Sequence, residues 1–438
     1  DVAPSRGLGD VYKRQHMDRV QRMYERSKNH PAIVIWSLGN EAGNGINFER
    51  TYDWFKSVES TRPVQYERAE QQYNTDIYCR MYRSVEELLA YARQANPKVY
   101  RPFIMTEYLH AMGNSGGGLK EYMDVFESEP IVQGGCIWDW VDQSFREIDA
   151  DGKWYWTYGG DYGPDNVPSF GNFCCNGLVN AVREPHPHLL EVKKAYQYIK
   201  CTLKDAGNLT LSVKNWYDFT NLDAYILKWS IVGDNGETIA KEECSLEVAP
   251  HATAEVSLGG VRLPENIREA YLNINWTPKH ASAFIGTDDV VAYDQFVLSG
   301  NKNSTAHRPQ KAGETTFTVD KKTGALTSLS LNGKELLSTP LTLSLFRPAT
   351  DNDNRDRNGA RLWRKAGLDN ITQKVLSLRE GKSSTTARVE ILNAKGQKVG
   401  TADFIYALDK NGALKVSTTF EPDTALVKSI ARLGVTFR

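Results

Sequence analysis

The strongest constraint on the fold is a short, mostly apolar run that ends abruptly in polar residues. Residues 33–38 read Ile-Val-Ile-Trp-Ser-Leu, and Gly39, Asn40 and Glu41 follow at once. A run of this length, rich in β-branched residues, is typical of a parallel strand buried on both faces. Polar residues at the carboxyl end of such a strand are typical of the catalytic face of a (β/α)8 barrel. An isolated glutamate is more often simply exposed, so a catalytic role for Glu41 needs support from elsewhere in the chain.

A strand–helix rhythm continues to about residue 199. Apolar runs predict strands near residues 33, 64, 76, 103 and 135, with helices over 16–28, 48–58, 84–95, about 119–126 and 189–199. This alternation indicates a (β/α)8 barrel, and we assign residues 16–199 to its carboxyl-terminal portion. A closed barrel has eight strands, so we expect the others to precede residue 16. Residues 1–15 lack the periodicity seen from residue 16 onward and stay unassigned, as a foreign or truncated edge.

Short alternating runs separated by turn residues replace the barrel pattern after residue 199. Residues 200–298 are predicted to form a β-sandwich, with strands that include 209–213, 224–232 and 270–276. Residues 299–313 are polar and are expected to be a linker. A second β-rich domain is predicted to start at residue 314 and continue to 438, with strands that include 315–319, 326–331 and 341–346.

Composition excludes several kinds of partner. The 53 basic residues nearly balance the 54 acidic ones, so no nucleic-acid partner is indicated. No apolar run approaches the ~20 residues of a membrane-spanning helix, so no membrane partner is expected. The six cysteines show neither a CxxC pair nor the spacing of a metal site.

Two glutamates follow predicted strands and form a candidate catalytic pair. Glu107 comes directly after the apolar run 103–105, as Glu41 does after its own run. Counted back from the last barrel strand, these glutamates end strands seven and four, which lie across the barrel mouth. Two carboxylates that flank a glycosidic bond are the equipment for glycoside hydrolysis, and in the retaining type they stand ~5–5.5 Å apart.

Four motifs in order make a family resemblance specific. They are WSLGNEAGNG, MTEYLHAMGNSGGG, GGCIWDWVDQS and NFCCNGLV. Over roughly residues 16–438 the sequence resembles glycoside hydrolase family 2, in particular its large bacterial β-galactosidases. The resemblance implies an incomplete TIM barrel, then an immunoglobulin-like β-sandwich, then the start of a galactose mutarotase-like β-sandwich. It also implies a retaining hydrolase that removes terminal β-D-galactose from lactose or larger glycans.

The resemblance implies a role for each of several residues. Glu41 would be the general acid/base and Glu107 the nucleophile. The predicted substrate-binding residues are Asn40 for the sugar 2-hydroxyl, Tyr82 as hydrogen-bond donor to the nucleophile, His110 as a sugar ligand and Trp138 as the floor under galactose. For these four the alternative is an ordinary structural role, as a turn-forming Asn, a core aromatic or a hydrogen-bonding His. Asp139, Trp140 and Asp142 are expected to be structural.

Cofactors and partners are implied in the same way. A divalent cation, Mg²⁺ or Ca²⁺, would bind Glu41, and Na⁺ would bind the Phe173 carbonyl and the Asn176 amide. The remaining ligands of both ions are expected upstream, and hard oxygen ligands suit these cations. The substrate would be a small molecule or an oligosaccharide. The full-length protein would be a homo-oligomer, and the resemblance implies a tetramer.

Two alternatives to a β-galactosidase stay open. The same barrel chemistry serves a β-glucuronidase or β-mannosidase, since those barrels share the Asn-Glu pair and the later Glu. A reading of another class is a carbohydrate-binding or structural remnant, because the sequence lacks part of the expected barrel. We expect the 438-residue chain on its own to be inactive. The sequence leaves the compartment open, cytoplasmic or periplasmic.

Overall fold

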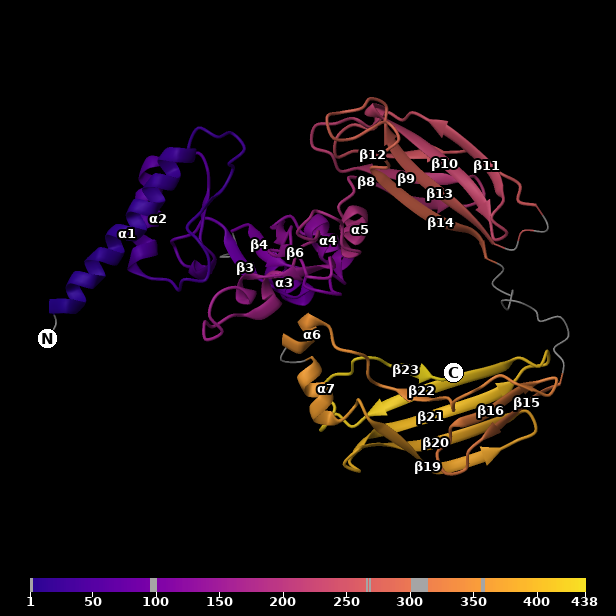
Figure 1. Cartoon of the computed structure of the whole chain (residues 1–438). Helices are drawn as coiled ribbons and strands as arrows, with labels where there is room; N and C mark the ends of the chain where they lie inside the picture. The colour runs from indigo at the N-terminus through magenta and orange to yellow at the C-terminus, as the bar shows by residue number, and fades with distance from the viewer. Residues whose placement is uncertain (1–2, 95–100, 265–266, 268, 301–313, 356–358) are drawn as a thin grey trace. The chain divides into compact units, whose positions relative to one another are not determined.

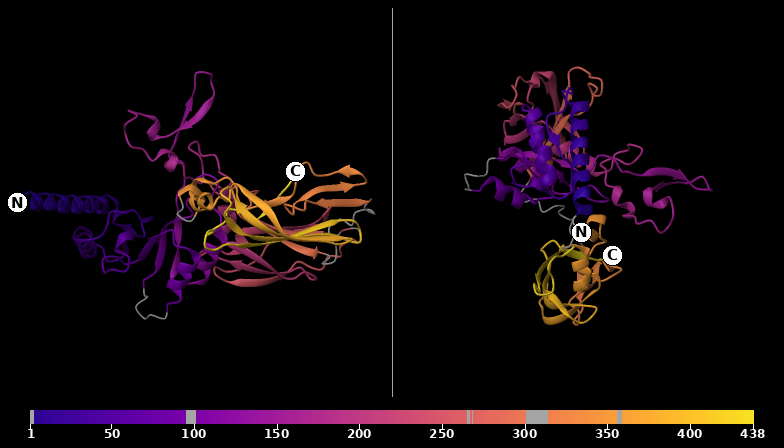
Figure 2. Two further views of the ribbon diagram at one scale, coloured as in Figure 1. Left: turned by 90° about the horizontal axis from the view of Figure 1, so that it is seen from below. Right: turned by 90° about the vertical axis from the view of Figure 1, so that its left-hand side faces the viewer.

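A computed structural model describes residues 3–94, 101–264, 267, 269–300, 314–355 and 359–438. The chain divides into two compact units, Asp1–Tyr196 and Gln197–Arg438, and each is described by itself. Figure 1 labels their helices and strands, and Figure 2 gives two further views. In the part of the chain so described, no helix combines the length and apolar character needed to span a membrane.

Parallel strands form the centre of the first unit. They are β1 (Trp36–Ser37), β2 (Val64–Gln65), β3 (Tyr78–Met81), β4 (Phe103–Tyr108) and β5 (Val132–Ile137). Strand β1 pairs with β2, and β3, β4 and β5 pair in sequence, all in parallel. A parallel bridge from Gln65 to Ile77 links the two groups. The strands predicted near residues 33, 64, 76, 103 and 135 are therefore confirmed, and their carboxyl ends share one edge.

Helices accompany these strands. They are α1 (Ala3–Ser27), α2 (Ile46–Val58), α3 (Val85–Ala92), α4 (Leu119–Ser128) and α5 (His188–Ala195). The capping box expected at the start of α3 is present, since Ser84 accepts a hydrogen bond from the Glu87 amide and the Glu87 side chain accepts one from the Ser84 amide. Buried residues of α3, α4 and the strands, among them Leu88, Met105 and Leu119, share one apolar core.

Two boundaries in this unit differ from the prediction. Helix α1 begins at Ala3, so most of the segment 1–15, left unassigned from the sequence, is helical. The helix predicted over 189–199 ends at Ala195, and Ile199 already begins strand β8. Ile199 and Cys201 alternate into the core of the following β-domain, and that burial favours a strand over a longer helix.

A β-hairpin that the sequence did not reveal follows β5. Its strands are β6 (Phe145–Ile148) and β7 (Trp154–Thr157), paired in antiparallel register. Figure 2 shows the hairpin, in magenta, standing out from the rest of its unit. All four residues of β6 are exposed, so the inward–outward alternation that predicts a half-buried strand is absent here.

The second unit begins with a β-sandwich of antiparallel strands. One sheet has the order β12-β9-β8, formed by Thr253–Ser257, Thr210–Asn215 and Ile199–Asp205. The other has the order β11-β10-β13-β14, formed by Thr238–Cys244, Tyr225–Gly233, Glu269–Pro278 and Ala292–Gly300. Apolar residues from both sheets, including Leu211, Ile231 and Leu272, form its core. Strand β14 extends to Gly300, so the first two residues of the predicted linker 299–313 belong to the sheet, and the others lie outside the described residues.

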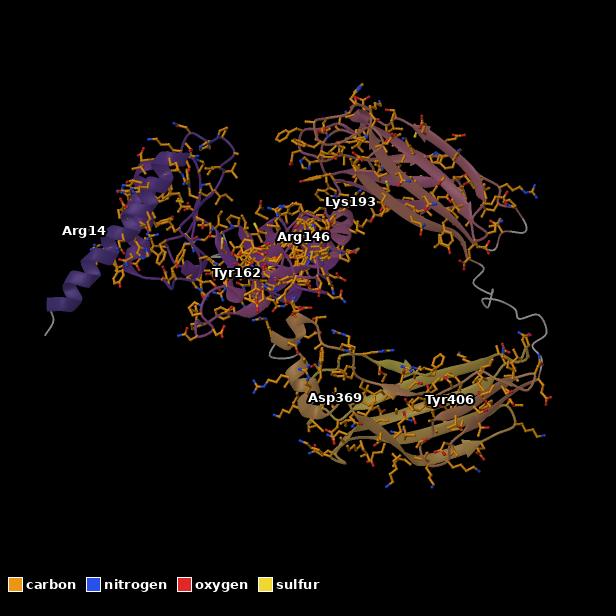
Figure 3. The ribbon with its side chains drawn as sticks, in the orientation of Figure 1. Arg14, Arg146, Tyr162, Lys193, Asp369 and Tyr406 are labelled. Carbon is orange, nitrogen blue, oxygen red and sulfur yellow. The ribbon has the colours of Figure 1, made fainter. Side chains whose placement is uncertain are left out.

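A second β-rich part completes the chain. Its largest sheet has the order β19-β20-β21-β22 and comprises Ile371–Glu380, Ser384–Asn393, Lys398–Leu408 and Leu414–Pro422. Strands β15 (Thr315–Val319), β16 (Leu326–Leu331) and β17 (Lys334–Glu335) form another sheet, while β18 (Thr342–Ser344) pairs with β23 (Gly434–Thr436). Helices α6 (Asp351–Arg355) and α7 (Ala360–Ala366) connect these strands along the chain. Tyr406, labelled in Figure 3, is fully buried in its core beside Phe404.

The β-sandwich core provides a stability test. Leu272 is fully buried while Val297 is 58% exposed, on the neighbouring strand. We expect Leu272→Ala to lower the free energy of unfolding of this domain by about 2–5 kcal/mol, because the cavity adds to the lost apolar contact. Val297→Ala should change it by less than about 0.5 kcal/mol. Denaturant titration followed by the fluorescence of the core residues Trp229 and Trp276 measures both, and equal effects would contradict this account of the core.

Candidate active site

Strand pairing brings the predicted catalytic residues to one edge of the sheet. Glu107 lies within β4 opposite Met81 of β3, and Glu41 follows β1. The backbone of Tyr82 donates a hydrogen bond of 2.8 Å to the Glu107 carbonyl. Glu41, Tyr82 and Leu109 all have a φ of 51°, a left-handed conformation that is uncommon outside glycine and that clusters at functional sites.

Two hydrogen bonds hold the Glu107 carboxylate. The Tyr82 hydroxyl donates to Oε2 at 2.9 Å, and Asn40 Nδ2 donates to Oε1 at 3.3 Å. Burial raises the pKa of Glu107 above its ordinary value, the Tyr82 hydrogen bond opposes that rise, and the negative charge of Glu41 adds to it. Burial and the bond to Glu107 also raise the pKa of Tyr82, so Tyr82 stays protonated and continues to donate.

Glu41 has a more open environment than Glu107. Its side chain is 59% exposed, and its Oε1 lies 3.5 Å from a guanidinium nitrogen of Arg68. Arg68 also contacts the buried Glu67 at 3.1 Å. Asn40, the residue before Glu41, donates a hydrogen bond to Glu107, so the two glutamates belong to the same edge of the sheet.

His110 and Phe173 form one wall of this region. Their rings stack with centroids 5.1 Å apart, and the Tyr82 ring meets His110 edge-on at 6.0 Å. Nε2 of His110 lies 3.5 Å from Nδ2 of Asn176. Tyr82 and Asn176, both predicted as site residues, thus contact the predicted sugar ligand His110 in the wall beside Glu107.

Trp138 lies between the ends of β4 and β5 and is half-buried. Its amide donates to the Tyr108 carbonyl at 3.0 Å, and its own carbonyl accepts from the Ala111 amide at 2.8 Å. The peptide bond from Trp138 to Asp139 is cis. These contacts fix the backbone of Trp138 at the same edge as the glutamates, and its role under the sugar stays a prediction.

A close backbone contact that the sequence did not reveal positions Asn176. Asp142 accepts hydrogen bonds from the Gly177 amide at 2.7 Å and from His186 Nε2 at 2.8 Å. A Cβ on Gly177 would lie only 2.2 Å from the Asp142 amide nitrogen, so this position requires glycine. Asp142, expected to be structural, therefore holds the segment that carries Asn176, together with Gly177 and His186. The motifs WDWVDQS and NFCCNGLV identified both segments in the sequence. Nothing in the sequence indicated that the two segments contact each other.

The residues predicted to bind Na⁺ fit such an ion. Asn176 is 2% exposed, its Nδ2 donates to the Phe173 carbonyl at 3.0 Å, and its Oδ1 is buried with no hydrogen-bond partner. A buried acceptor without a partner costs about 1–3 kcal/mol, and a cation at this oxygen would remove that cost. The Phe173 carbonyl, which accepts the hydrogen bond from Asn176, provides a second oxygen close to the same place.

The residues predicted for the divalent cation, unlike those for Na⁺, do not form a site by themselves. No group of three or more His, Cys, Asp or Glu side chains able to hold a metal ion occurs among the described residues. Glu41 has the cationic Arg68 beside it, which disfavours a second positive charge. The described side chains therefore do not form a divalent site by themselves, although the Glu41 carboxylate is a suitable single ligand.

Comparison with known families is consistent with this geometry. The family described as "Glycosyl hydrolases family 2, TIM barrel domain" matches residues 7–201. "Beta-galactosidase, domain 4" matches residues 211–299, and "Beta galactosidase small chain" matches residues 311–438. The chain belongs to glycoside hydrolase family 2, and its three parts are a partial TIM barrel followed by β-rich domains of the β-galactosidase type.

Curated relatives that match this chain are named as beta-galactosidases. The chain is 36% identical to a beta-galactosidase of Priestia megaterium, over 98% of this chain and 43% of the relative. It is 32% identical to beta-galactosidase 2 of Enterobacter cloacae, over 91% of this chain and 42% of the relative. The chain thus spans less than half the length of these relatives. A solved family 2 member from Bacteroides cellulosilyticus is 13% identical, with a TM-score of 0.32 over 95% of this chain and 51% of that one.

The hydrogen bond from Tyr82 provides a pH test. We expect Tyr82→Phe to raise the pKa of Glu107 further, because the bond at Oε2 stabilises the ionised carboxylate. Glu107 would then keep its proton to a higher pH. Carboxyl titration by ¹³C NMR of a glutamate-labelled chain measures this shift. Tyr73→Phe is the control, since Tyr73 bonds Asp53 instead, and an unchanged or lower Glu107 pKa in Tyr82→Phe would contradict the assignment.

Proposed function

We propose that this chain supplies the catalytic glutamates of a retaining β-galactosidase, which removes terminal β-D-galactose from lactose or larger glycans. The observation that carries the proposal is the Glu107 carboxylate, held by Tyr82 and by Asn40, which is the residue next to Glu41 in the chain. Two neighbouring carboxylates with different surroundings are what double displacement requires. The curated relatives above bear the name beta-galactosidase, which favours galactose as the sugar.

The first step of the proposed reaction uses both glutamates. An oxygen of Glu107 attacks the anomeric carbon while the bond to the leaving oxygen breaks, and protonated Glu41 gives that oxygen its proton. Tyr82 and Asn40 keep the Glu107 carboxylate in one orientation before attack. The product is a galactosyl ester on Glu107 and a free alcohol or sugar.

The second step reverses these roles. Once Glu107 is esterified, it no longer carries the negative charge that repels Glu41. Ionised Glu41, beside Arg68 at 3.5 Å, then takes a proton from water as the water attacks the anomeric carbon. Glu107 leaves as a carboxylate, and two inversions give net retention.

Cofactors and partners form part of the same proposal. Asn176 and the Phe173 carbonyl would hold Na⁺, which would fix the wall that includes His110. A divalent ion, Mg²⁺ or Ca²⁺, would use Glu41 with ligands from outside the described residues. The match of residues 311–438 to a small-chain domain supports association with a large chain. Assembly into a homotetramer is proposed for the full-length protein.

The alternatives make different predictions for substrates. A β-glucuronidase or β-mannosidase would share Glu41 and Glu107 but prefer another sugar, and a carbohydrate-binding remnant would hydrolyse none. A panel of nitrophenyl β-galactoside, β-glucuronide and β-mannoside, tested on a full-length protein carrying this chain, separates them. The β-galactoside should be the preferred substrate.

Azide chemistry tests the two catalytic roles separately. In a full-length protein, Glu107→Gly should lower hydrolysis about 10⁴-fold or more, and azide should replace the missing nucleophile to give α-galactosyl azide. Glu41→Ala should lower hydrolysis about 10²–10⁴-fold for a substrate that needs acid assistance. Azide should then open the galactosyl ester and give the β-anomer. Product NMR distinguishes the anomers, and the same anomer from both variants would contradict the assignment.

The Na⁺ proposal has a test that does not need activity. Thermal unfolding in sodium chloride and in choline chloride should show extra stability in Na⁺, by up to about 2.7 kcal/mol at a hundredfold excess over Kd. Asn176→Ala should abolish this difference because it removes the buried oxygen. Asn114→Ala, at an exposed position, should keep it. An equal response to both salts in the unsubstituted protein would overturn the proposal.

A further inference from the structure

A pocket of about 410 Å³ lies on the hairpin that the proposed reaction does not use. It is lined by residues of the hairpin and of the short helix η2 (Gly159–Asp161): Glu147, Tyr155, Trp156, Thr157, Asp161 and Tyr162. Ligand pockets usually measure ~300–1,000 Å³, so its size suits a small ligand. Figure 3 labels Tyr162 and Arg146 in this region.

Hydrogen bonds shape this pocket in the absence of any ligand. Cross-strand pairing of Glu147 with Tyr155 places both side chains on one face of the hairpin. The Tyr162 hydroxyl donates to Glu147 Oε1 at 2.8 Å and lies 2.7 Å from the Thr157 hydroxyl. Asp161 accepts from the Tyr158 amide at 2.9 Å, which fixes η2. The walls are therefore held in place before anything binds.

The chemistry of the lining is that of a sugar site. Tyr155, Trp156 and Tyr162 remain 47%, 36% and 48% exposed, so their apolar ring surfaces are accessible. Glu147 and Asp161 offer carboxylate oxygens, which accept hydrogen bonds from hydroxyl groups. Among the described residues, none that lines the pocket is basic. Rings for the C–H face of a pyranose and acceptors for its hydroxyls occur together here.

We propose that this pocket is a second saccharide-binding site, which takes a neutral pyranose unit of an oligosaccharide. The choice of ligand class rests on the proposed function, whereas the pocket itself does not. Its two acidic side chains should repel a uronic acid, because like charges without a cation between them are unfavourable. The site therefore selects neutral glycans.

Chain contacts connect the pocket to the catalytic region. Gly160 of η2 packs so closely on Ser169 that a Cβ would lie 2.2 Å from its hydroxyl oxygen. The next residue, Phe170, is 84% exposed, and its ring lies 6.4 Å from that of Phe173. Phe173 in turn stacks on His110. The rings of Phe170, Phe173 and His110 therefore follow one another toward the catalytic region, and Gly160 joins η2 of the pocket to the segment where this series begins.

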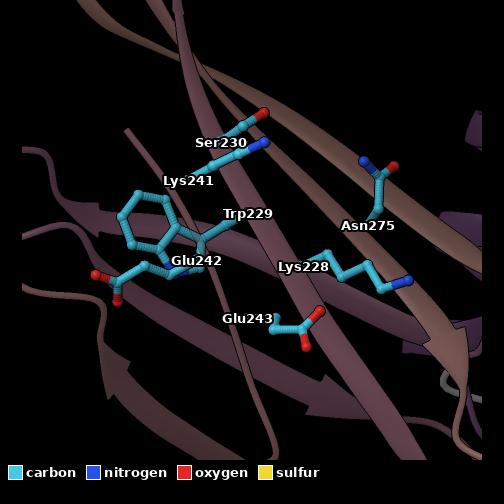
Figure 4. A pocket seen from close by; sticks show the side chains of 7 residues that line it. All are labelled: Lys228, Trp229, Ser230, Lys241, Glu242, Glu243 and Asn275. Atoms are coloured by element: carbon cyan, nitrogen blue, oxygen red, sulfur yellow. The ribbon is translucent and has the colours of Figure 1, made fainter. Parts of the chain in front are cut away.

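A hollow in the second unit lacks this chemistry. About 400 Å³ in volume, it lies on strands β10, β11 and β13 (Figure 4). Two of its charged residues, Lys228 and Glu243, lie opposite each other on neighbouring strands. Its aromatic residue, Trp229, is only 5% exposed and belongs to the core. It lacks an accessible ring face and resembles an ordinary solvated sheet face.

The hairpin offers a matched pair of variants. Tyr155 lines the pocket and is 47% exposed, while Ile148 is 67% exposed and lies on the opposite face of the hairpin, since Tyr155 pairs with the neighbouring Glu147. Calorimetric titration of a full-length Glu107→Gln protein, which lacks the proposed nucleophile and so leaves the sugar intact, with β(1→4)-linked galactotriose should detect a second binding event besides that at the catalytic centre. Tyr155→Ala should weaken it about tenfold, and Ile148→Ala less than about twofold. Circular dichroism checks that both variants fold.

A second, independent test changes the charge of the pocket and keeps its shape, through the variant Glu147→Gln. A trisaccharide with a galacturonate unit should bind more weakly than galactotriose, and Glu147→Gln should reduce this difference. The proposal is overturned if galactotriose shows no second binding event, if Tyr155→Ala leaves that event unchanged, or if Ile148→Ala has the larger effect. Failure of the proposed function is distinct: nitrophenyl galactoside would not be hydrolysed although galactotriose still bound.

Discussion

The site depends on the parallel pairing of β3 with β4. This register sets Met81 opposite Glu107, so the next residue, Tyr82, reaches Glu107 twice, through its amide and through its hydroxyl. A shift of one residue would turn every side chain of the strand to the other face. The same edge of the sheet receives Asn40 from the end of β1. The pairing of β3 with β4 therefore helps to orient the Glu107 carboxylate, because it sets the position of Tyr82.

The sequence predicted the regular parts of the fold well, because their apolar periodicity is strong. The parallel strands, the Ser84–Glu87 capping box and the strands β15 and β16 were all located from local pattern. The hairpin β6–β7 was missed because none of the residues of β6 is buried, which leaves no alternation to read. The helix predicted to reach Ile199 was too long, because burial of Ile199 in the β-sandwich outweighs the helical pattern.

For the site, sequence motifs identified residues but not their mutual contacts. The structure brings Glu41, Asn40, Tyr82, Glu107 and His110 to one region. The strand order predicted a shared region for the two glutamates, whereas the family resemblance supplied the other three residues. The bond from Gly177 to Asp142 joins residues 35 positions apart, and that from His186 to Asp142 spans 44. Contacts at such separations have no period in the chain, since they arise from how two loops meet at the end of β5. Their importance is visible only once the backbone is in place.

One consequence concerns the buried Oδ1 of Asn176. An acceptor that has no donor within the described protein makes the surrounding segment sensitive to what the solution supplies. With Na⁺ bound at this oxygen, as proposed above, the cation in a purification buffer would become part of the folded structure. Replacing a sodium salt with an ammonium or organic one, often treated as a matter of convenience, would then remove the ion bound near Phe173 and His110.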